Sequence, residues 1–169
     1  KFTKSKDFHT FYYCIIICGI MNRKSKRKDA KNMKYILASA SPRRKELMTQ
    51  AGFSFQVVPS QVKETISKTR PSDIVTELSS QKALEVYERL QPEDCTVIGA
   101  DTIVVYRDEI LGKPADEAEA LDMLSLLAGR THQVYTGVTL VRKETSGSRP
   151  KIRSFYEKTD VEFYPIHRE

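Results

Sequence analysis

The chain of 169 residues has only three cysteines, and two of them, Cys14 and Cys18, lie near the N-terminus. Cys95 is alone in the rest of the sequence, which leaves neither a disulfide framework nor the spacing of a zinc site. Apolar residues make up 40% and charged residues 30% of the chain, as in ordinary globular proteins. We therefore expect one domain with a core of its own, in the cytoplasm.

Long apolar runs are also scarce. The stretch Phe11–Ile20 has ten residues, which are too few to span a bilayer, so we expect no membrane partner. Three lysines precede this stretch, as in a signal peptide, but no small-residue cleavage site follows it. The next basic block, Arg23–Lys28, has the composition of a nuclear-localisation or surface-binding patch.

The net charge of +6 belongs to the beginning of the chain. Residues 1–32 hold nine Lys or Arg and two Asp, whereas the remainder is almost neutral. We expect residues 1–32 to be a disordered or non-native extension and residues 33–169 to be the functional domain, with no affinity for nucleic acid. Attachment to nucleic acid or a membrane through Arg23–Lys28 is the alternative.

Strand and helix patterns alternate after residue 33, which predicts an α/β fold with a sheet flanked by helices. The expected helices cover residues 42–50, 71–90 and 115–127. The expected strands cover residues 35–40, 53–58, 96–106 with a break at Gly99–Asp101, 132–142 and 152–164. Residues 60–70 are typical of a loop, and residues 107–109 of a hairpin tip.

The segment Ser39–Arg44 opens the first expected helix. Ser41 is suited to cap that helix and Pro42 to occupy its first position. Arg43 and Arg44 then lie in the first turn, where positive charge opposes the helix dipole. A bound phosphate or carboxylate would relieve this cost, so the segment indicates an anion site. Two solvated surface arginines are the alternative.

Asp101 follows an apolar run, where an ionised carboxylate is costly to bury unless it is paired or binds a metal. A bulge or turn is the alternative reading. If Glu64 converges with Asp101, the two provide the carboxylates that Mg²⁺ takes together with phosphate oxygens. Considered without its neighbours, Lys82 is expected to be a solvated lysine. Lys113 would add a cation at a strand-to-helix turn.

Several short motifs in this order resemble those of the Maf family of nucleoside triphosphate pyrophosphatases. The matching segments are Leu37–Leu47, Glu64 in VPSQVKE, Lys82 in QKA, Gly99–Thr102, Gly112–Pro114 and Thr131–Val138. The resemblance implies an elongated mixed sheet flanked by helices, with a ligand cleft. It also implies hydrolysis of a nucleoside triphosphate to the monophosphate and pyrophosphate, with Mg²⁺ or Mn²⁺.

The resemblance also implies roles for particular residues. Phosphates would be held by Ser39, Arg43, Arg44, Lys82 and Lys113. Glu64 and Asp101 would serve the metal and the attacking water, with Lys82 beside them. Asp101 is the expected base, and a metal-ligand role is its alternative. Arg44 and Thr102 match the branch of the family that prefers dTTP and UTP.

One family segment, resembling Lys-Ala-Gly-x-Tyr-Gly-x-Gln-Gly, does not occur before the chain ends at Glu169. Its Gln would complete the base-selecting set with Arg44 and Thr102. We therefore expect a C-terminally truncated domain, and a catalytically impaired nucleotide-binding or regulatory module is the alternative to an active enzyme. The nucleoside triphosphate is the expected partner, and a homodimer is left open.

Overall fold

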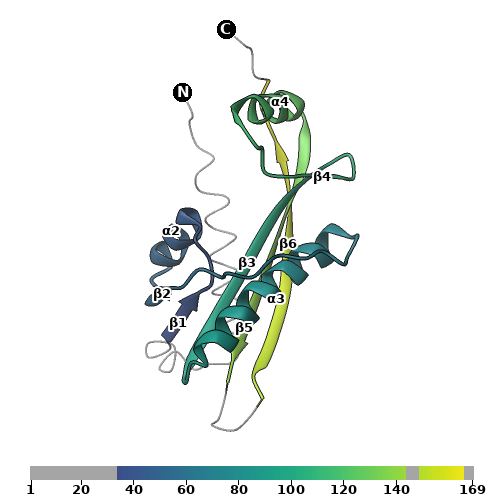
Figure 1. Cartoon of the computed structure of the whole chain (residues 1–169). Helices are drawn as coiled ribbons and strands as arrows, with labels where there is room; N and C mark the ends of the chain where they lie inside the picture. The colour runs from purple at the N-terminus through teal and green to yellow at the C-terminus, as the bar shows by residue number, and fades with distance from the viewer. Residues whose placement is uncertain (1–33, 144–148, 166–169) are drawn as a thin grey trace.

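The computed structural model describes residues 34–143 and 149–165, so the expectations for residues 1–32 lie outside the described residues. Figure 1 shows the elements in space. The helices are α2 (Pro42–Gln50), α3 (Pro71–Leu90) and α4 (Glu117–Leu127). The strands are β1 (Lys34–Leu37), β2 (Phe55–Val57), β3 (Cys95–Tyr106), β4 (Glu109–Leu111), β5 (Thr131–Arg142) and β6 (Lys151–Glu162).

Six strands form one mixed sheet in the order β2-β1-β3-β5-β6, with β4 also paired to β3. β1 runs parallel to β2 and β3, and the other pairs are antiparallel. β3, β5 and β6 have 12 residues each, which makes the sheet long in one direction. The predicted elongated, mixed α/β sheet is confirmed.

The predicted elements occur in the predicted order, but the short strand β4 was not predicted and some boundaries differ. The break expected at Gly99–Asp101 is wrong, because β3 continues through these residues. β1 ends at Leu37 instead of residue 40, and β2 begins at Phe55 instead of residue 53. Ser41 does cap α2, with Pro42 in its first turn, as the sequence predicts.

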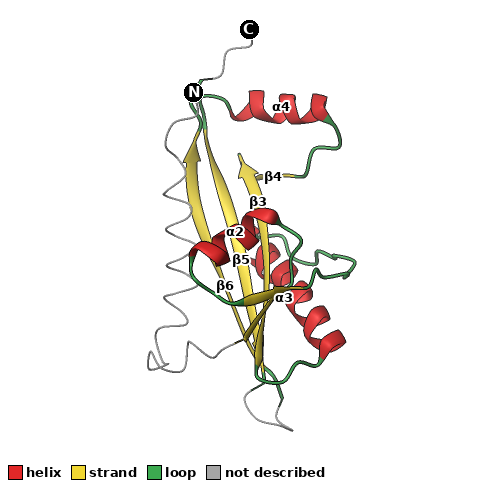
Figure 2. Ribbon diagram, turned by 90° about the vertical axis from the view of Figure 1, so that its left-hand side faces the viewer, coloured by secondary structure: helices red, strands yellow, loops and turns green. Residues whose placement is uncertain are grey.

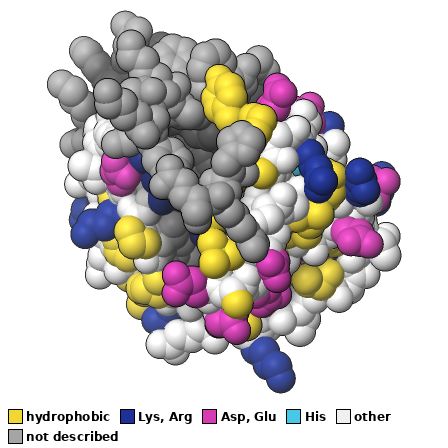
Figure 3. Space-filling model, turned by 90° about the horizontal axis from the view of Figure 1, so that it is seen from above, with side chains coloured by type: hydrophobic (Ala, Val, Ile, Leu, Met, Phe, Trp, Pro, Cys, Tyr) yellow, Lys and Arg dark blue, Asp and Glu magenta, His cyan; other side chains and the backbone are white. Residues whose placement is uncertain are grey.

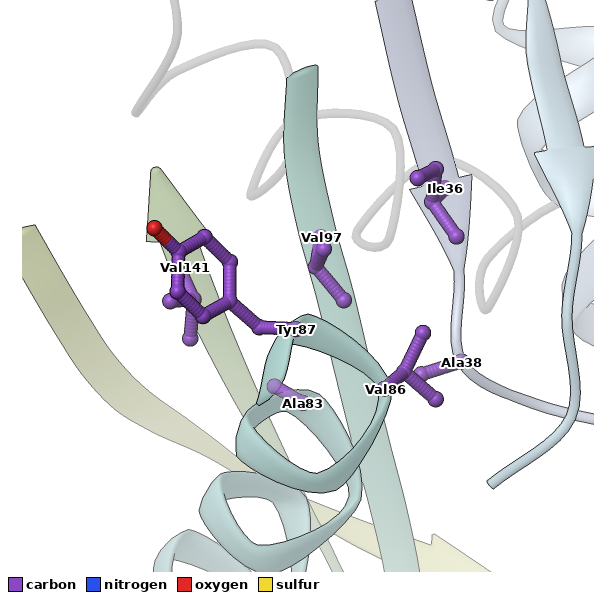
Figure 4. Close-up of a cluster of buried hydrophobic side chains, with 7 residues drawn as sticks. All are labelled: Ile36, Ala38, Ala83, Val86, Tyr87, Val97 and Val141. Atoms are coloured by element: carbon purple, nitrogen blue, oxygen red, sulfur yellow. The ribbon is translucent and has the colours of Figure 1, made fainter. Parts of the chain in front are cut away.

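Helices α2 and α3 cover opposite faces of the sheet, because successive residues of a strand point to opposite sides. Tyr35 and Leu37 of β1 pack in one cluster with Met48 of α2. Ile36, between them, packs in a second cluster with Val86 of α3, which Figure 4 shows. The chain therefore passes from β1 over one face of the sheet to β2, and from β2 over the other face to β3.

Helix α4 lies at one end of the long strands, away from α2 and α3 (Figure 1). Leu127 is its one buried residue, whereas Leu121 and Leu124 are exposed. Figure 3 looks onto the molecule from this end and shows hydrophobic side chains at the surface among acidic and basic ones. Figure 2 shows that α4 is separated from the part of the sheet between α2 and α3. That part of the sheet, and not α4, forms the frame of the site described below.

Two glycines let α3 approach the sheet at backbone distance. A Cβ on Gly99 of β3 would overlap the carbonyl oxygen of Ser79 and lie 2.7 Å from the backbone nitrogen of Ala83. A Cβ on Gly137 of β5 would overlap the backbone of Val75 in the same way. Both glycines are thus required by the close packing of one helix on two neighbouring strands.

We predict that Gly99→Ala lowers the free energy of unfolding by about 3 kcal/mol or more, because backbone atoms of α3 must move to admit the methyl group. Urea denaturation of the purified variant measures the change. Gly112→Ala is the matched control, since a Cβ there meets nothing within 4 Å. Its stability should stay within about 1 kcal/mol of the parent. Equal stability of the two variants would contradict the prediction.

Candidate functional site

The centre of β3 has an open edge. β5 pairs with one side of β3 over nearly its whole length. On the other side, β1 pairs as far as Ile98 and β4 pairs from Val104 onward. Between these two points, residues 99–103 have no strand partner on that side among the described residues. The chain leaves β1 at this point, with Ala38 N–H donating to Ile98 O at 2.8 Å, and turns into α2. In open α/β sheets, ligands bind where strands end in this way.

Asp101 and Thr102 lie in the middle of this open edge. As neighbours in a strand, their side chains point to opposite faces of the sheet. Asp101 contacts Lys82 of α3, whereas Thr102 contacts Arg44 of α2. The site therefore has two halves, one on each face, which meet at the open edge of β3.

The acidic half consists of Glu64, Lys82 and Asp101. Lys82 Nζ donates to Asp101 Oδ1 and lies 3.1 Å from Glu64 Oε1. The side chains of Lys82 and Asp101 are each 13% exposed, and that of Glu64 is 44% exposed. A largely buried ion pair is costly to break by removing one partner, so Lys82 and Asp101 depend on each other. One ammonium group thus holds two carboxylates close together.

The arginine half consists of Ser39, Arg44, Thr102 and Thr136. Arg44 Nη1 donates to Ser39 Oγ at 3.1 Å, and Nη2 donates to Thr102 Oγ1 at 3.3 Å. Thr102 Oγ1 also lies 3.1 Å from Thr136 Oγ1 on β5. These contacts fix the plane of the guanidinium group, which matters because that plane determines which oxygens it meets in pairs.

A small apolar pocket adjoins the arginine half. Its lining comes from β1, α2, β3 and β5, and consists of Leu37, Arg44, Leu47, Met48, Ile98, Ala100 and Val138. Arg44 therefore presents its stem to apolar side chains and its head to hydroxyl groups, as arginines often do at the edge of a core.

Six of the eight predicted site residues are brought together in these two halves, and two are not. Arg43 pairs with Glu46 at 2.8 Å, and both side chains are about half exposed. Lys113 is exposed, and no hydrogen bond or ion pair joins it to either half within the described residues. β4 ends two residues before Lys113, on the same edge of β3 as the site. The roles of all eight residues stay predictions.

The acidic half offers a divalent metal two carboxylates, which is fewer than a complete set of protein ligands. The described residues include no group of three or more His, Cys, Asp or Glu that could hold a metal ion. Glu64 and Asp101 place two carboxylates beside one cation. Mg²⁺ is commonly bound by one or two carboxylates together with phosphate oxygens and water. The donor set therefore suits Mg²⁺ or Mn²⁺ that arrives with a phosphate ligand.

Residues 34–169 match the family model described as Maf-like protein. The chain belongs to the Maf family. Among its Maf relatives, a protein of Bacillus cereus named dTTP/UTP pyrophosphatase is 52% identical over 145 residues, which are 85% of this chain and 68% of the relative. A protein of the same name from Agathobacter rectalis is 51% identical over 145 residues, which are 79% of this chain and 70% of the relative.

Among solved structures, the dITP/XTP pyrophosphatase of Mycobacterium abscessus is 16% identical, with a TM-score of 0.45. The match covers 76% of this chain and 72% of that one. This low score adds nothing to the family assignment. No helix in the described part of the Maf chain is long and apolar enough to cross a membrane.

The sequence did not identify the residues that hold Glu64 in place. The loop of residues 58–70 runs along α3, where one row of side chains binds its backbone. This loop-binding row joins Glu77 to Ser67, Gln81 to Thr65, Glu85 to Gln61, and Arg89 to Pro59. Its members are four residues apart, which places them on one face of the helix. The four-residue spacing can be read from the sequence, but nothing in the sequence indicates that these side chains bind the loop.

Hydrogen bonds lower the pKa of two glutamates in the row of this Maf chain. The Ser67 hydroxyl and backbone N–H donate to Glu77 and hold the pKa of its carboxyl below the ordinary value. Arg89 donates to Glu85 and, with the backbone N–H of Gln61, lowers the pKa of that carboxyl against the opposing effect of burial. Both carboxylates therefore bind the loop in their ionised form.

We predict that acid releases two of the loop contacts. Since both pKa values lie below 4.5 in the folded chain, the two contacts stabilise the loop above that pH and are lost as the pH falls through the lowered values. An NMR titration of the Gln61 and Ser67 amide protons should give midpoints below 4.5. The Thr65 amide is the control, because Gln81 does not titrate. Midpoints at or above the ordinary value would contradict the prediction.

Proposed function

We propose that this chain is a nucleoside triphosphate pyrophosphatase that prefers dTTP and UTP. The observation that carries the proposal is the meeting of an acidic half and an arginine half at the open edge of β3. Relatives that are about half identical over most of the chain bear the name dTTP/UTP pyrophosphatase, which supports the same substrate class.

In the proposed reaction, water attacks the α-phosphorus of the triphosphate. A bond forms between the water oxygen and this phosphorus while the bond to the α,β-bridging oxygen breaks. The bridging oxygen leaves with pyrophosphate, and the nucleoside monophosphate is the other product. The attacking water gives up a proton, so a base must lie on the side of the phosphorus opposite to the leaving group.

Asp101 is the proposed base, and Glu64 orients the same water or shares the metal. Lys82 holds both carboxylates close together, and its ammonium group has a third hydrogen that it can donate to a phosphate oxygen. A bound Mg²⁺ or Mn²⁺ ion would be held by Glu64 and Asp101, and it would supply positive charge to the phosphate oxygens. Cations placed where negative charge develops are often the largest contribution to catalysis.

The arginine half is proposed to bind the other end of the substrate. Arg44 lies between the N-terminus of α2, which favours phosphate, and Thr102, whose hydroxyl faces the same side. We therefore assign Arg44 to both phosphate binding and base selection, and Thr102 to base selection alone. Ser39 positions Arg44 and binds phosphate. For Arg43 and Lys113, which the structure does not bring into either half, phosphate binding rests on the family resemblance alone.

The cytoplasmic location stays a prediction from the cysteine usage. The absence of nucleic-acid and membrane binding by the body of the chain likewise stays a prediction, and a homodimer is left open. The nucleotide is the partner that the site geometry supports.

We predict that Asp101→Asn lowers the rate of pyrophosphate release from dTTP and UTP by about 100-fold or more, because the amide cannot accept the proton. Pyrophosphate is measured with each triphosphate in the presence of Mg²⁺. Asp108→Asn at the exposed tip of the β3–β4 hairpin is the matched control and should keep the parent rate. Folded parent protein that binds triphosphates without turnover, unchanged by Asp101→Asn, would favour a nucleotide-binding module. No release from any triphosphate would refute the enzyme.

We predict that Arg44→Lys raises KM for dTTP and UTP by about tenfold or more, because one ammonium group cannot reach Ser39 and Thr102 together as the guanidinium does. Initial rates over a range of nucleotide concentrations give KM and kcat. Arg107→Lys in the hairpin, where Arg107 lies over the ring of Tyr106, is the control for loss of an arginine elsewhere. An unchanged KM in Arg44→Lys would remove Arg44 from the binding site.

A further inference from the structure

Gln81 holds the backbone of Thr65 from two directions. Its Oε1 accepts the Thr65 N–H at 3.1 Å, and its Nε2 donates to the Thr65 carbonyl oxygen at 2.6 Å. Nε2 also lies 3.3 Å from Thr65 Oγ1. One side chain thus satisfies both backbone groups of one residue, as a neighbouring strand would. The other three members of the loop-binding row bind the loop through a carboxylate or a guanidinium group.

The two residues in this clamp are the chain neighbours of the Glu64–Lys82 ion pair. Thr65 follows Glu64 directly, and Gln81 directly precedes Lys82. The clamp therefore ties the backbones on both sides of that pair, 16 residues apart in the sequence.

The ion pair alone is too weak to place Glu64. Its carboxylate is 44% exposed, and ion pairs in contact with water are worth about 0–1 kcal/mol. The loop of residues 58–70 contains no helix or strand of its own. A carboxylate on such a segment would move by more than the tolerance of a reacting group unless its backbone were fixed.

We propose that Gln81 is a positioning residue, which fixes the backbone at Thr65 so that the Glu64 carboxylate stays beside Lys82 and Asp101. This inference rests on the proposed pyrophosphatase activity. Gln81 acts through Glu64 and does not touch the substrate. Its removal affects the chemical step more than binding, because phosphates are held chiefly from the arginine half and by Lys82.

The first test replaces Gln81 with methionine, which keeps the length and helix propensity of the side chain and removes both hydrogen bonds. We expect kcat for dTTP to fall roughly 10- to 100-fold from misplacement of Glu64, with KM within about twofold of the parent. Glu88→Met on the exposed side of α3 is the matched control and keeps both constants. Parent kcat in folded Gln81→Met, or a rise in KM alone, would overturn the proposal. Gln81→Ala serves in the same assay should the methionine variant fail to fold.

The second test asks whether Gln81 acts through Glu64. In a double-mutant cycle, Gln81→Met should cost little further activity once Glu64→Gln is present, because the group that Gln81 positions is already lost. If the activity losses of the two single variants multiply in the double variant, Gln81 acts by a route independent of Glu64. That result would overturn the proposal.

The third test needs no catalysis. Hydrogen exchange of the Thr65 amide should become roughly 2- to 10-fold faster in Gln81→Met, as expected for loss of one hydrogen bond. The Gln61 and Ser67 amides, held by other members of the row, should exchange at the parent rate. An unchanged exchange rate of the Thr65 amide would show that Gln81 does not hold the Thr65 backbone. Failure of the parent to hydrolyse any triphosphate would refute the proposed function and the positioning role, while this measurement would still decide whether the clamp exists.

Discussion

The contact of α3 with β3 and β5 at Gly99 and Gly137 is the constraint on which the rest of the site depends. Because neither glycine has a side chain, the helix backbone lies directly on the sheet, and its position along β3 is fixed. Lys82 is one residue before Ala83, which meets Gly99, and Asp101 is two residues after Gly99 on the same face. A helix held farther away could not keep the short Asp101 side chain in contact with Lys82. Packing at backbone distance is therefore what makes the ion pair possible.

The same helix also organises the loop, so α3 contributes to the site from two of its faces. One face meets the sheet, where Ser79 and Thr139 share a buried hydrogen bond of 2.9 Å. The other bears the loop-binding row, which brings residues 58–70 alongside Lys82. Glu64 and Asp101 come from separate segments and meet because both are fixed to one rigid element. This arrangement explains how a carboxylate on a loop without regular structure is placed with the accuracy that catalysis requires.

The sequence predicted the order of the elements apart from β4, the cap at Ser41, and six residues that the structure brings together, because these depend on local patterns and short motifs. It failed at Gly99–Asp101, where a glycine followed by a carboxylate indicated a break in the strand. The glycine serves a helix contact instead, and the carboxylate is tolerated inside the strand because the edge is open and Lys82 is its partner. The loop-binding row was missed for a related reason. Glutamate, glutamine and arginine on a helix are ordinarily solvated, and only the tertiary path of the loop gives them partners.

The open edge of β3 explains why two kinds of chemistry can share one site. In a fully paired strand, Asp101 and Thr102 would face two separate compartments, divided by the backbone of the neighbouring strand. Since β1 ends at Ile98 and β4 begins pairing at Val104, no strand among the described residues divides them. A ligand lying across this edge can reach the acidic half on the α3 face with one end and the arginine half on the α2 face with the other. A long, flexible, polyanionic ligand with one polar aromatic end has the shape and charge for such a path.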